Sequence, residues 1–256
     1  MSDKVRQALV VLSVLAVIGV NALANVLPIN GQTTGAVANQ FDVYFFPAGY
    51  AFSIWSLIYL GLAAFAVYQA LPDQRHNPRL RRVGYMVMLT GLANIAWIFF
   101  WHYELFPLSL LAMLILLGAL IAIYQLLEVG QIRVSAAEKW LVQAPFSIYL
   151  AWVTVATIAN VTILLAYLDW DGWGISPAVW TVIMIIIGLA IAAVVSLPRS
   201  DTAYLLVIAW AFTAIAVRQV DAPLVFTSAA IAALLALILA VAAFINNYRF
   251  GLPRPT

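Results

Sequence analysis

The chain has 256 residues, of which 66% are hydrophobic and 9% are charged, and its formal net charge is +2. A soluble domain is about half apolar and about a quarter charged, so this composition excludes a soluble globular protein and indicates a polytopic membrane protein. The small, dispersed charge gives no indication of nucleic-acid binding. Because the sequence contains no cysteine, disulfides and thiolate metal sites are excluded as well.

Apolar runs of about 20 residues are long enough to cross a bilayer as helices. The sequence predicts an all-α membrane helix bundle of about eight transmembrane helices, at roughly 5–27, 48–71, 80–101, 107–128, 138–168, 176–197, 201–219 and 223–247. Lys4 and Arg6 precede the first run, and no small-residue cleavage site follows it convincingly. We therefore interpret it as a retained helix and not as a removed signal peptide.

The charges separate into two groups along the chain. Lys and Arg are enriched in cytoplasmic segments. With a cytoplasmic N-terminus, the inner segments hold Lys4, Arg6, Arg75, Arg79, Arg81, Arg82, Arg133, Lys139, Arg199, Arg249 and Arg254. The outer segments then hold Asp42, His102, Glu104, Asp169, Asp171 and Asp221, and only Arg218 breaks the separation. This pattern predicts a multi-pass protein of a bacterial cytoplasmic membrane with both termini cytoplasmic and an even number of helices.

One connection is long, from Pro28 to Pro47, and it changes from polar residues to an aromatic group that ends at Phe46. It could form a lid over a cavity, or it could lie flat at the headgroup level, where aromatic rings are enriched. At the outer end of the third helix, His102 and Glu104 are expected to be exposed loop residues, with contact to a ligand or proton exchange as the alternatives.

Three predicted helices carry aromatic residues at spacings of three and four, so that these residues share a helix face. On the second helix this face carries Trp55 and Tyr59; on the third and fifth helices it also carries small or polar residues, with Asn94, Trp97 and Trp101, then Tyr149, Trp152, Ala156 and Asn160. If these faces converge, they form an apolar pocket with few polar groups, the usual form of a small-molecule site. The alternative is that they are interlocking packing faces, in which Asn hydrogen-bonds between helices.

The same helices carry three specific patterns. Pro-x(7)-Trp-x(3)-Tyr is met by Pro47, Trp55 and Tyr59, and Asn-x-x-Trp by Asn94 and Trp97; Tyr-Leu-x-Trp-x(3)-Ala-Thr-x(2)-Asn is met by Tyr149, Leu150, Trp152, Ala156, Thr157 and Asn160. In these patterns the chain resembles the tryptophan-rich sensory protein family, also called the translocator protein, peripheral benzodiazepine receptor or TspO/MBR family. The resemblance covers about residues 5–168, which implies a five-helix ligand-binding block at 1–168 and a three-helix extension at 169–256.

The resemblance implies an internal pocket for porphyrins, haem or related apolar ligands, in some members sterols, and often a homodimer. By position, the pocket would be lined by Pro47, Tyr50, Trp55, Asn94, Trp97, Trp152 and Ala156. The chain departs from the family pattern at Ser53, where a Pro is usual, and in the spacing of Pro145 from the fifth-helix motif. No basic residue follows Tyr167, so the sequence gives no support for the sterol motif.

After the sequence DWDGWG at 169–174, the helices become rich in Ala, Ile, Val and Leu, which predicts a closely packed scaffold. Those helices could replace a dimer interface or add a second surface. Arg218 and Asp221 are expected to form a local ion pair, or Arg218 to extend toward water.

Enzyme motifs for zinc peptidases, serine hydrolases and phosphate binding are missing from the sequence. The two histidines, His76 and His102, are predicted on opposite sides of the membrane, where they could not ligate one haem. We therefore expect a lipid-embedded protein that binds, senses or transports a planar apolar ligand such as a tetrapyrrole, with no required cofactor. The alternatives are a structural or partner-regulating scaffold, and photo-oxidation of bound porphyrin assisted by Trp55 and Trp152.

Overall fold

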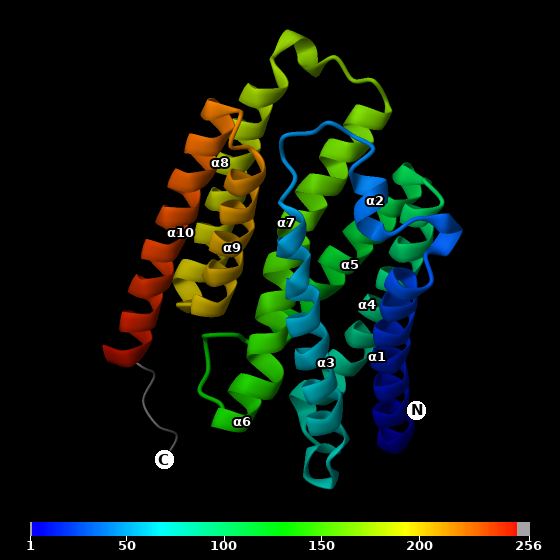
Figure 1. Cartoon of the computed structure of the whole chain (residues 1–256). Helices are drawn as coiled ribbons and strands as arrows, with labels where there is room; N and C mark the ends of the chain where they lie inside the picture. The colour runs from blue at the N-terminus through cyan, green and yellow to red at the C-terminus, as the bar shows by residue number, and fades with distance from the viewer. Residues whose placement is uncertain (1, 250–256) are drawn as a thin grey trace. The chain divides into compact units, whose positions relative to one another are not determined.

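The structure is a computed structural model that describes residues 2–249 (Figure 1). The main helices are α1 (Asp3–Val26), α2 (Thr34–Ala38), α3 (Ile54–Ala70), α4 (Pro78–His102), α5 (Phe106–Leu126), α6 (Ala136–Glu138), α7 (Ala144–Tyr167), α8 (Pro177–Ser196), α9 (Thr202–Arg218) and α10 (Pro223–Arg249). Single helical turns lie at Ile29–Gly31, Gly49–Ser53, Pro72–Gln74, Lys139–Gln143, Gly172–Gly174 and Leu197–Arg199. No strand occurs among the described residues.

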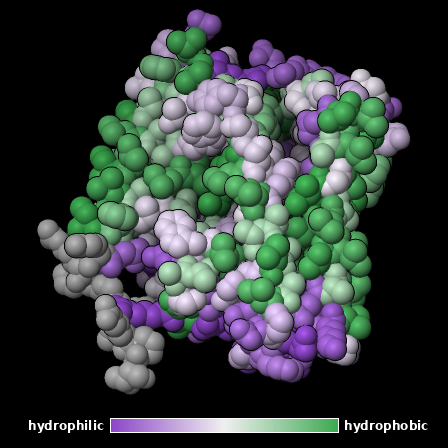
Figure 2. Space-filling view, turned by 60° about the horizontal axis from the view of Figure 1, so that its bottom comes forward, coloured by the Kyte–Doolittle hydropathy of each residue, from purple (hydrophilic) through white to green (hydrophobic). Residues whose placement is uncertain are grey.

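The predicted all-α bundle of membrane helices is confirmed for residues 2–249, and an apolar helix lies at each of the eight predicted spans. Seven of its helices are long and apolar enough to cross a membrane, and α9, at 17 residues, is a shorter apolar helix. The hydrophilic residues gather near the helix ends and the hydrophobic residues along the helix sides, as Figure 2 shows for one face. The chain is therefore a polytopic helical membrane protein. The prediction for Arg254 falls outside the described residues.

Prolines mark several helix starts. Pro78, Pro107 and Pro177 lie in the first turns of α4, α5 and α8. A proline is tolerated there because the backbone N–H that it lacks would have no partner within the helix. The side chain of Asn77 caps α4 by accepting hydrogen bonds from the backbone N–H groups of Arg79 and Leu80.

The contacts of the chain divide it into two compact units. Unit 1 comprises Met1–Gln40, Trp55–Glu128 and Ser135–Leu150, and unit 2 comprises Phe41–Ile54, Val129–Val134 and Ala151–Thr256. Helix α7 begins in unit 1 and ends in unit 2. The predicted boundary at residue 168 marks where the family resemblance ends, whereas these units are defined by contacts in space. The boundary therefore stays a prediction.

In unit 1, α4 packs against both α1 and α5. The N-terminal end of α1 is fixed by a buried Arg6, which is 2% exposed and donates to the backbone oxygens of Leu80 at 3.1 Å and Arg75 at 3.2 Å. Beside it, the Gln7 amide donates to the backbone oxygen of Gln69 at 2.6 Å. Arg6, predicted as a topological charge, thus also joins the N-terminus to the connection before α4.

Helices α3 and α7 approach closely at Gly61. A Cβ atom on this glycine would lie 2.9 Å from Cβ of Pro145. One π turn, Lys139–Gln143, precedes Pro145, and the backbone N–H of Ala144 donates to the carbonyl of Lys139. A π turn is a usual device for accommodating a locally irregular helix. It lets the proline ring lie in the gap that Gly61 leaves.

Unit 2 contains α8, α9 and α10, which pack against one another. Small residues line the buried side of α10 at Ala229, Ala232, Ala236, Ala240 and Ala243. On α8, a Cβ atom at Gly188 would lie 3.1 Å from the ring of Phe212 on α9. Small side chains allow helix backbones to approach closely in lipid, as the sequence predicts for this part of the chain.

Candidate functional site

A group of aromatic rings surrounds Tyr149 in unit 1. Tyr149 is 1% exposed, and the ring of Trp55 lies edge-to-face with it at a centroid distance of 5.9 Å. Trp55 also stacks on Tyr59 at 5.5 Å, one turn further along α3. The second and fifth predicted helices therefore do bring their aromatic faces together at these three residues.

A chain of buried polar side chains joins α1, α4 and α7 at the same place. The Asn21 amide donates to Oδ1 of Asn94 at 2.7 Å, and the Asn94 amide donates to the hydroxyl of Tyr149 at 3.3 Å. Asn94 is completely buried. The sequence patterns indicated Asn94 and Tyr149 but not Asn21. Asn21 is a polar residue inside the apolar run of the first helix, and that position could have indicated it as a candidate.

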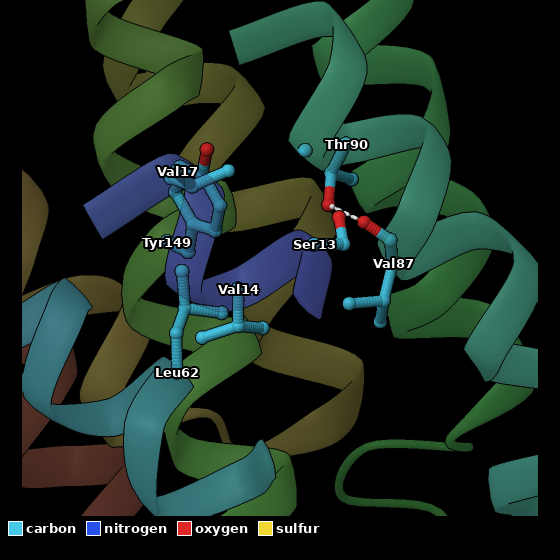
Figure 3. Close-up of a pocket in the computed structure, with 8 residues that line it drawn as sticks. Ser13, Val14, Val17, Leu62, Val87, Thr90 and Tyr149 are labelled. Atoms are coloured by element: carbon cyan, nitrogen blue, oxygen red, sulfur yellow. Dashed lines mark hydrogen bonds between the residues drawn. The ribbon is translucent and has the colours of Figure 1, made fainter. Parts of the chain in front are cut away.

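A small cavity lies next to this polar chain (Figure 3). Its lining comes from α1, α3, α4 and α7 and consists of Ser13, Val14, Val17, Leu62, Val87, Thr90, Gly91 and Tyr149. Figure 3 shows Ser13 facing Thr90, whose hydroxyl donates to the backbone oxygen of Val87 at 2.8 Å. The volume of this cavity is about 10 Å³, which is about enough for one water molecule. A tetrapyrrole does not fit this cavity as it stands.

The other predicted residues of α4 lie at its C-terminal end. Trp97 and Trp101 stack on each other at 5.4 Å, and the indole N–H of Trp101 donates to the backbone oxygen of Thr34 at 3.0 Å. Next to them, His102 is completely buried, with Nδ1 2.7 Å from the backbone oxygen of Ile98 and Nε2 3.3 Å from the Thr34 hydroxyl. The expectation of an exposed His102 is wrong, because α4 continues through this residue and α2 covers it.

Glu104 fastens the first half of the long connection to this end of α4. Its carboxylate accepts hydrogen bonds from the amides of Gln32 at 2.8 Å and Gln40 at 3.0 Å. These two bonds hold the pKa of Glu104 below its ordinary value. The Asn30 amide adds a bond to the backbone oxygen of His102 at 3.0 Å. The hypothesis of a lid stays open, but this half of the connection is tied to α4.

In unit 2, the segment before α3 carries the predicted residues Pro47 and Tyr50. Pro47 is buried, whereas Tyr50 is 43% exposed. Phe52, in the same segment, lies edge-to-face with Trp152 of α7 at 5.9 Å. Trp152 and Asn160 are buried, and Ala156 is partly exposed. Phe52 is a contact that the sequence patterns did not indicate.

Helix α9 holds this segment in place. The backbone N–H of Ala48 donates to the oxygen of Ala214 at 2.9 Å, and the indole N–H of Trp210 donates to the oxygen of Ala51 at 3.2 Å. The Gln219 amide donates to the oxygen of Tyr44 at 3.0 Å, and the guanidinium of Arg218 lies 5.2 Å from the ring centroid of Phe46. Helix α9 is therefore more than packing scaffold. Arg218, the charge that breaks the topological pattern, was the signal for it.

The eleven predicted ligand residues thus divide between the units. Trp55, Tyr59, Asn94, Trp97, Trp101 and Tyr149 belong to unit 1, and Pro47, Tyr50, Trp152, Ala156 and Asn160 belong to unit 2. The prediction that all of them surround one void stays a prediction. His76 and His102 lie at opposite ends of α4, whose 25 residues span roughly 37 Å, so they cannot ligate one haem together.

The family model described as TSPO-like protein matches residues 7–243. The chain belongs to the TSPO-like protein family. This match extends through α8, α9 and α10, which lie beyond the region covered by the sequence motifs. No match was found among the curated proteins or the solved structures. The match and the apolar helices together show a multi-pass membrane protein. Membership of this family suggests that the protein binds or senses a ligand.

Proposed function

We propose that this TSPO-like protein binds a planar apolar ligand, a tetrapyrrole such as a porphyrin or haem, and acts in sensing or transport. The observation that supports this most is the buried chain of Asn21, Asn94 and Tyr149 with the ring of Trp55 beside it. Polar side chains inside a membrane bundle carry a free-energy cost and are often functional. An aromatic face beside a polar group suits a flat ligand that has a polar edge.

Binding at this place requires side chains to move, because the adjacent cavity of about 10 Å³ holds about one water molecule. Trp55 and Tyr59 are partly exposed and are the rings that turn aside. The bond of 3.3 Å between Asn94 and Tyr149 is the longer of the two in the polar chain. This hydrogen bond is the one that breaks on binding, so that the side chains of Asn94 and Tyr149 can bond to the polar edge of the ligand.

The test is titration of protoporphyrin IX into the full chain in detergent, followed by quenching of tryptophan fluorescence. Replacing Trp55 and Tyr59 together by Ala, the two rings of α3 beside Tyr149, is expected to raise Kd by about tenfold or more, as for aromatic residues that dominate a binding site. The matched control is Trp140→Ala, since Trp140 is 70% exposed and was not predicted as a ligand residue. Unchanged affinity in the double variant overturns the site.

A second candidate function is a structural or partner-regulating membrane scaffold without a small-molecule ligand. It is favoured by direct contact among the rings of Trp55, Tyr59 and Tyr149. In that case the same substitutions lower the unfolding temperature, and no tetrapyrrole raises it. If the unfolding temperature rises with porphyrin concentration, the folded protein binds the porphyrin, and this result supports the ligand-binding function.

We propose a bacterial cytoplasmic membrane as the location of the protein, with both termini cytoplasmic. The charge pattern supports this orientation, which a cysteine introduced at either end would test by labelling from one side. We propose a binding protein and not an enzyme, with no required cofactor and with a possible homodimer as its assembly. The alternative enzymatic activity is photo-oxidation of bound porphyrin assisted by Trp55 and Trp152. An unchanged porphyrin spectrum after illumination would exclude this reaction.

A further inference from the structure

Three tryptophans cluster at the connection between α7 and α8 in unit 2, at the top of the view in Figure 1. The ring centroids of Trp170, Trp173 and Trp180 are 5.2, 5.3 and 5.9 Å apart, and each ring is tilted from the other two by 53° to 82°. We call these three rings, with the connecting residues 168–176, the indole turn. Each ring contacts both of the others; Trp173 is exposed, and Trp170 and Trp180 are partly exposed.

The backbone of the indole turn is fixed in an uncommon conformation. Asp169, Gly172, Trp173 and Gly174 all have positive φ, with 53° at Trp173. A bulky residue rarely adopts this conformation, so the surroundings must hold it. The Asp171 carboxylate accepts a bond from the N–H of Trp173 at 2.9 Å, and the Trp180 indole N–H donates to the Gly172 oxygen at 2.8 Å. Trp173 is nevertheless 76% exposed.

The position and the charge of the indole turn indicate what covers it. It connects two candidate membrane spans, Ala136–Tyr167 and Pro177–Arg199, and so lies at the level of the lipid headgroups. It carries two carboxylates, Asp169 and Asp171, and the sequence has no Lys, Arg or His between Lys139 and Arg199. The connection itself therefore offers no cationic partner to an anionic headgroup, whereas it offers a cationic headgroup two carboxylates and three indole rings.

We propose that the indole turn binds the ammonium headgroup of a zwitterionic phospholipid through cation–π contacts. A quaternary ammonium is a usual ligand of clustered aromatic rings, and Trp is the strongest ring for this contact. A cation resting on this triangle of rings can lie within about 6 Å of all three centroids, the distance over which the attraction acts. The two carboxylates favour the cationic headgroup further. This lipid site is independent of the tetrapyrrole site.

The test uses the full chain in nanodiscs that contain equal amounts of phosphatidylcholine and phosphatidylglycerol. The protein is released, and native mass spectrometry counts the lipids that remain bound. The wild type is expected to retain phosphatidylcholine preferentially, and Trp173→Ala to lower that retention by about three- to tenfold. The matched control, Trp140→Ala, removes another highly exposed indole and is expected to leave the retention unchanged.

A second variant, Asp169→Asn with Asp171→Asn, separates charge from aromatic surface. It leaves the three rings in place, and the amide introduced at position 171 keeps an oxygen that can accept the bond from Trp173. The pair is expected to reduce the preference for phosphatidylcholine over phosphatidylglycerol.

Two results overturn the proposal directly: equal retention of the two lipids by the wild type, or a Trp173→Ala variant that retains lipid as the wild type does. A third result points to another occupant. If Trp173→Ala changes the ratio of monomer to dimer without changing lipid retention, the turn contacts a second copy of the chain and the proposal fails.

Discussion

The buried chain of Asn21, Asn94 and Tyr149 allows a quantitative prediction in which two bonds of different length share one residue. Asn94 accepts from Asn21 at 2.7 Å and donates to Tyr149 at 3.3 Å. A hydrogen bond weakens as the donor and acceptor separate, so the bond to Asn21 should be the stronger of the two. Interhelical hydrogen bonds in membranes average about 0.6 kcal/mol and reach about 1.7 kcal/mol.

Double-mutant cycles measure these two bonds while the cavity terms of the single substitutions cancel. We expect Asn21→Ala and Asn94→Ala to couple by about 1 to 1.7 kcal/mol, near the upper end of the membrane range. Asn94→Ala and Tyr149→Phe should couple by about 0.5 kcal/mol or less, because their bond is long. The free energy of unfolding is measured for each variant by reversible denaturation in mixed micelles.

The control cycle pairs Asn94→Ala with Gln69→Ala, since Gln69 bonds with Gln7 at the C-terminal end of α3. That pair should be additive within about 0.5 kcal/mol. The reasoning is refuted if the Asn21–Asn94 coupling is no larger than this control. It is also refuted if the coupling to Tyr149 exceeds the coupling to Asn21, because the order of the two distances would then have no energetic meaning.

Three further predictions concern other parts of the chain. Gly61→Ala should destabilise the protein by about 1 to 3 kcal/mol, because its Cβ would lie 2.9 Å from Cβ of Pro145, whereas Gly118→Ala, with nothing within 4 Å, should not destabilise it; thermal unfolding of both checks this. Because its two hydrogen bonds lower the folded-state pKa of Glu104, its stabilising effect is present above the unfolded pKa of about 4.5 and is lost as pH falls through the folded-state pKa. The protection factors of α2 in hydrogen exchange, which are corrected for the intrinsic exchange rate at each pH, should therefore fall there, and in Glu104→Gln this pH dependence should vanish. Gln219→Ala removes two bonds to backbone oxygens of the segment before α3, and exchange should rise in that segment while α10 is unchanged.

Much of the fold was predictable because a bilayer leaves the backbone few alternatives. Every apolar run must satisfy its own N–H and C=O groups, so hydropathy and length suffice to predict helices. The eight predicted spans agree with the observed helices within a few residues. For example, the span predicted at 80–101 is observed as α4, Pro78–His102. The aromatic spacing likewise predicted that Trp55, Tyr59 and Tyr149 would lie near one another.

Partners across the bundle were not predictable, since they depend on how the helices rotate and approach. Asn21 looked like one polar residue in an apolar span, and only packing of α1 on α4 makes it the partner of Asn94. His102 was expected outside the helix, and α2 buries it. The role of α9 in holding Ala48 and Ala51 comes from contacts more than 150 residues apart in sequence.

The sequence by itself determined the class of protein, the positions of its eight long apolar helices and the family resemblance, because these follow from local hydropathy and from residues spaced within single helices. Only the tertiary structure decided that Asn94 bonds to Asn21, that α9 carries the segment with Pro47, and that the space beside Tyr149 is small. Those features arise from side chains meeting across helices, where the small size of Gly61 or Gly91 sets how closely two backbones approach and no local pattern records the result.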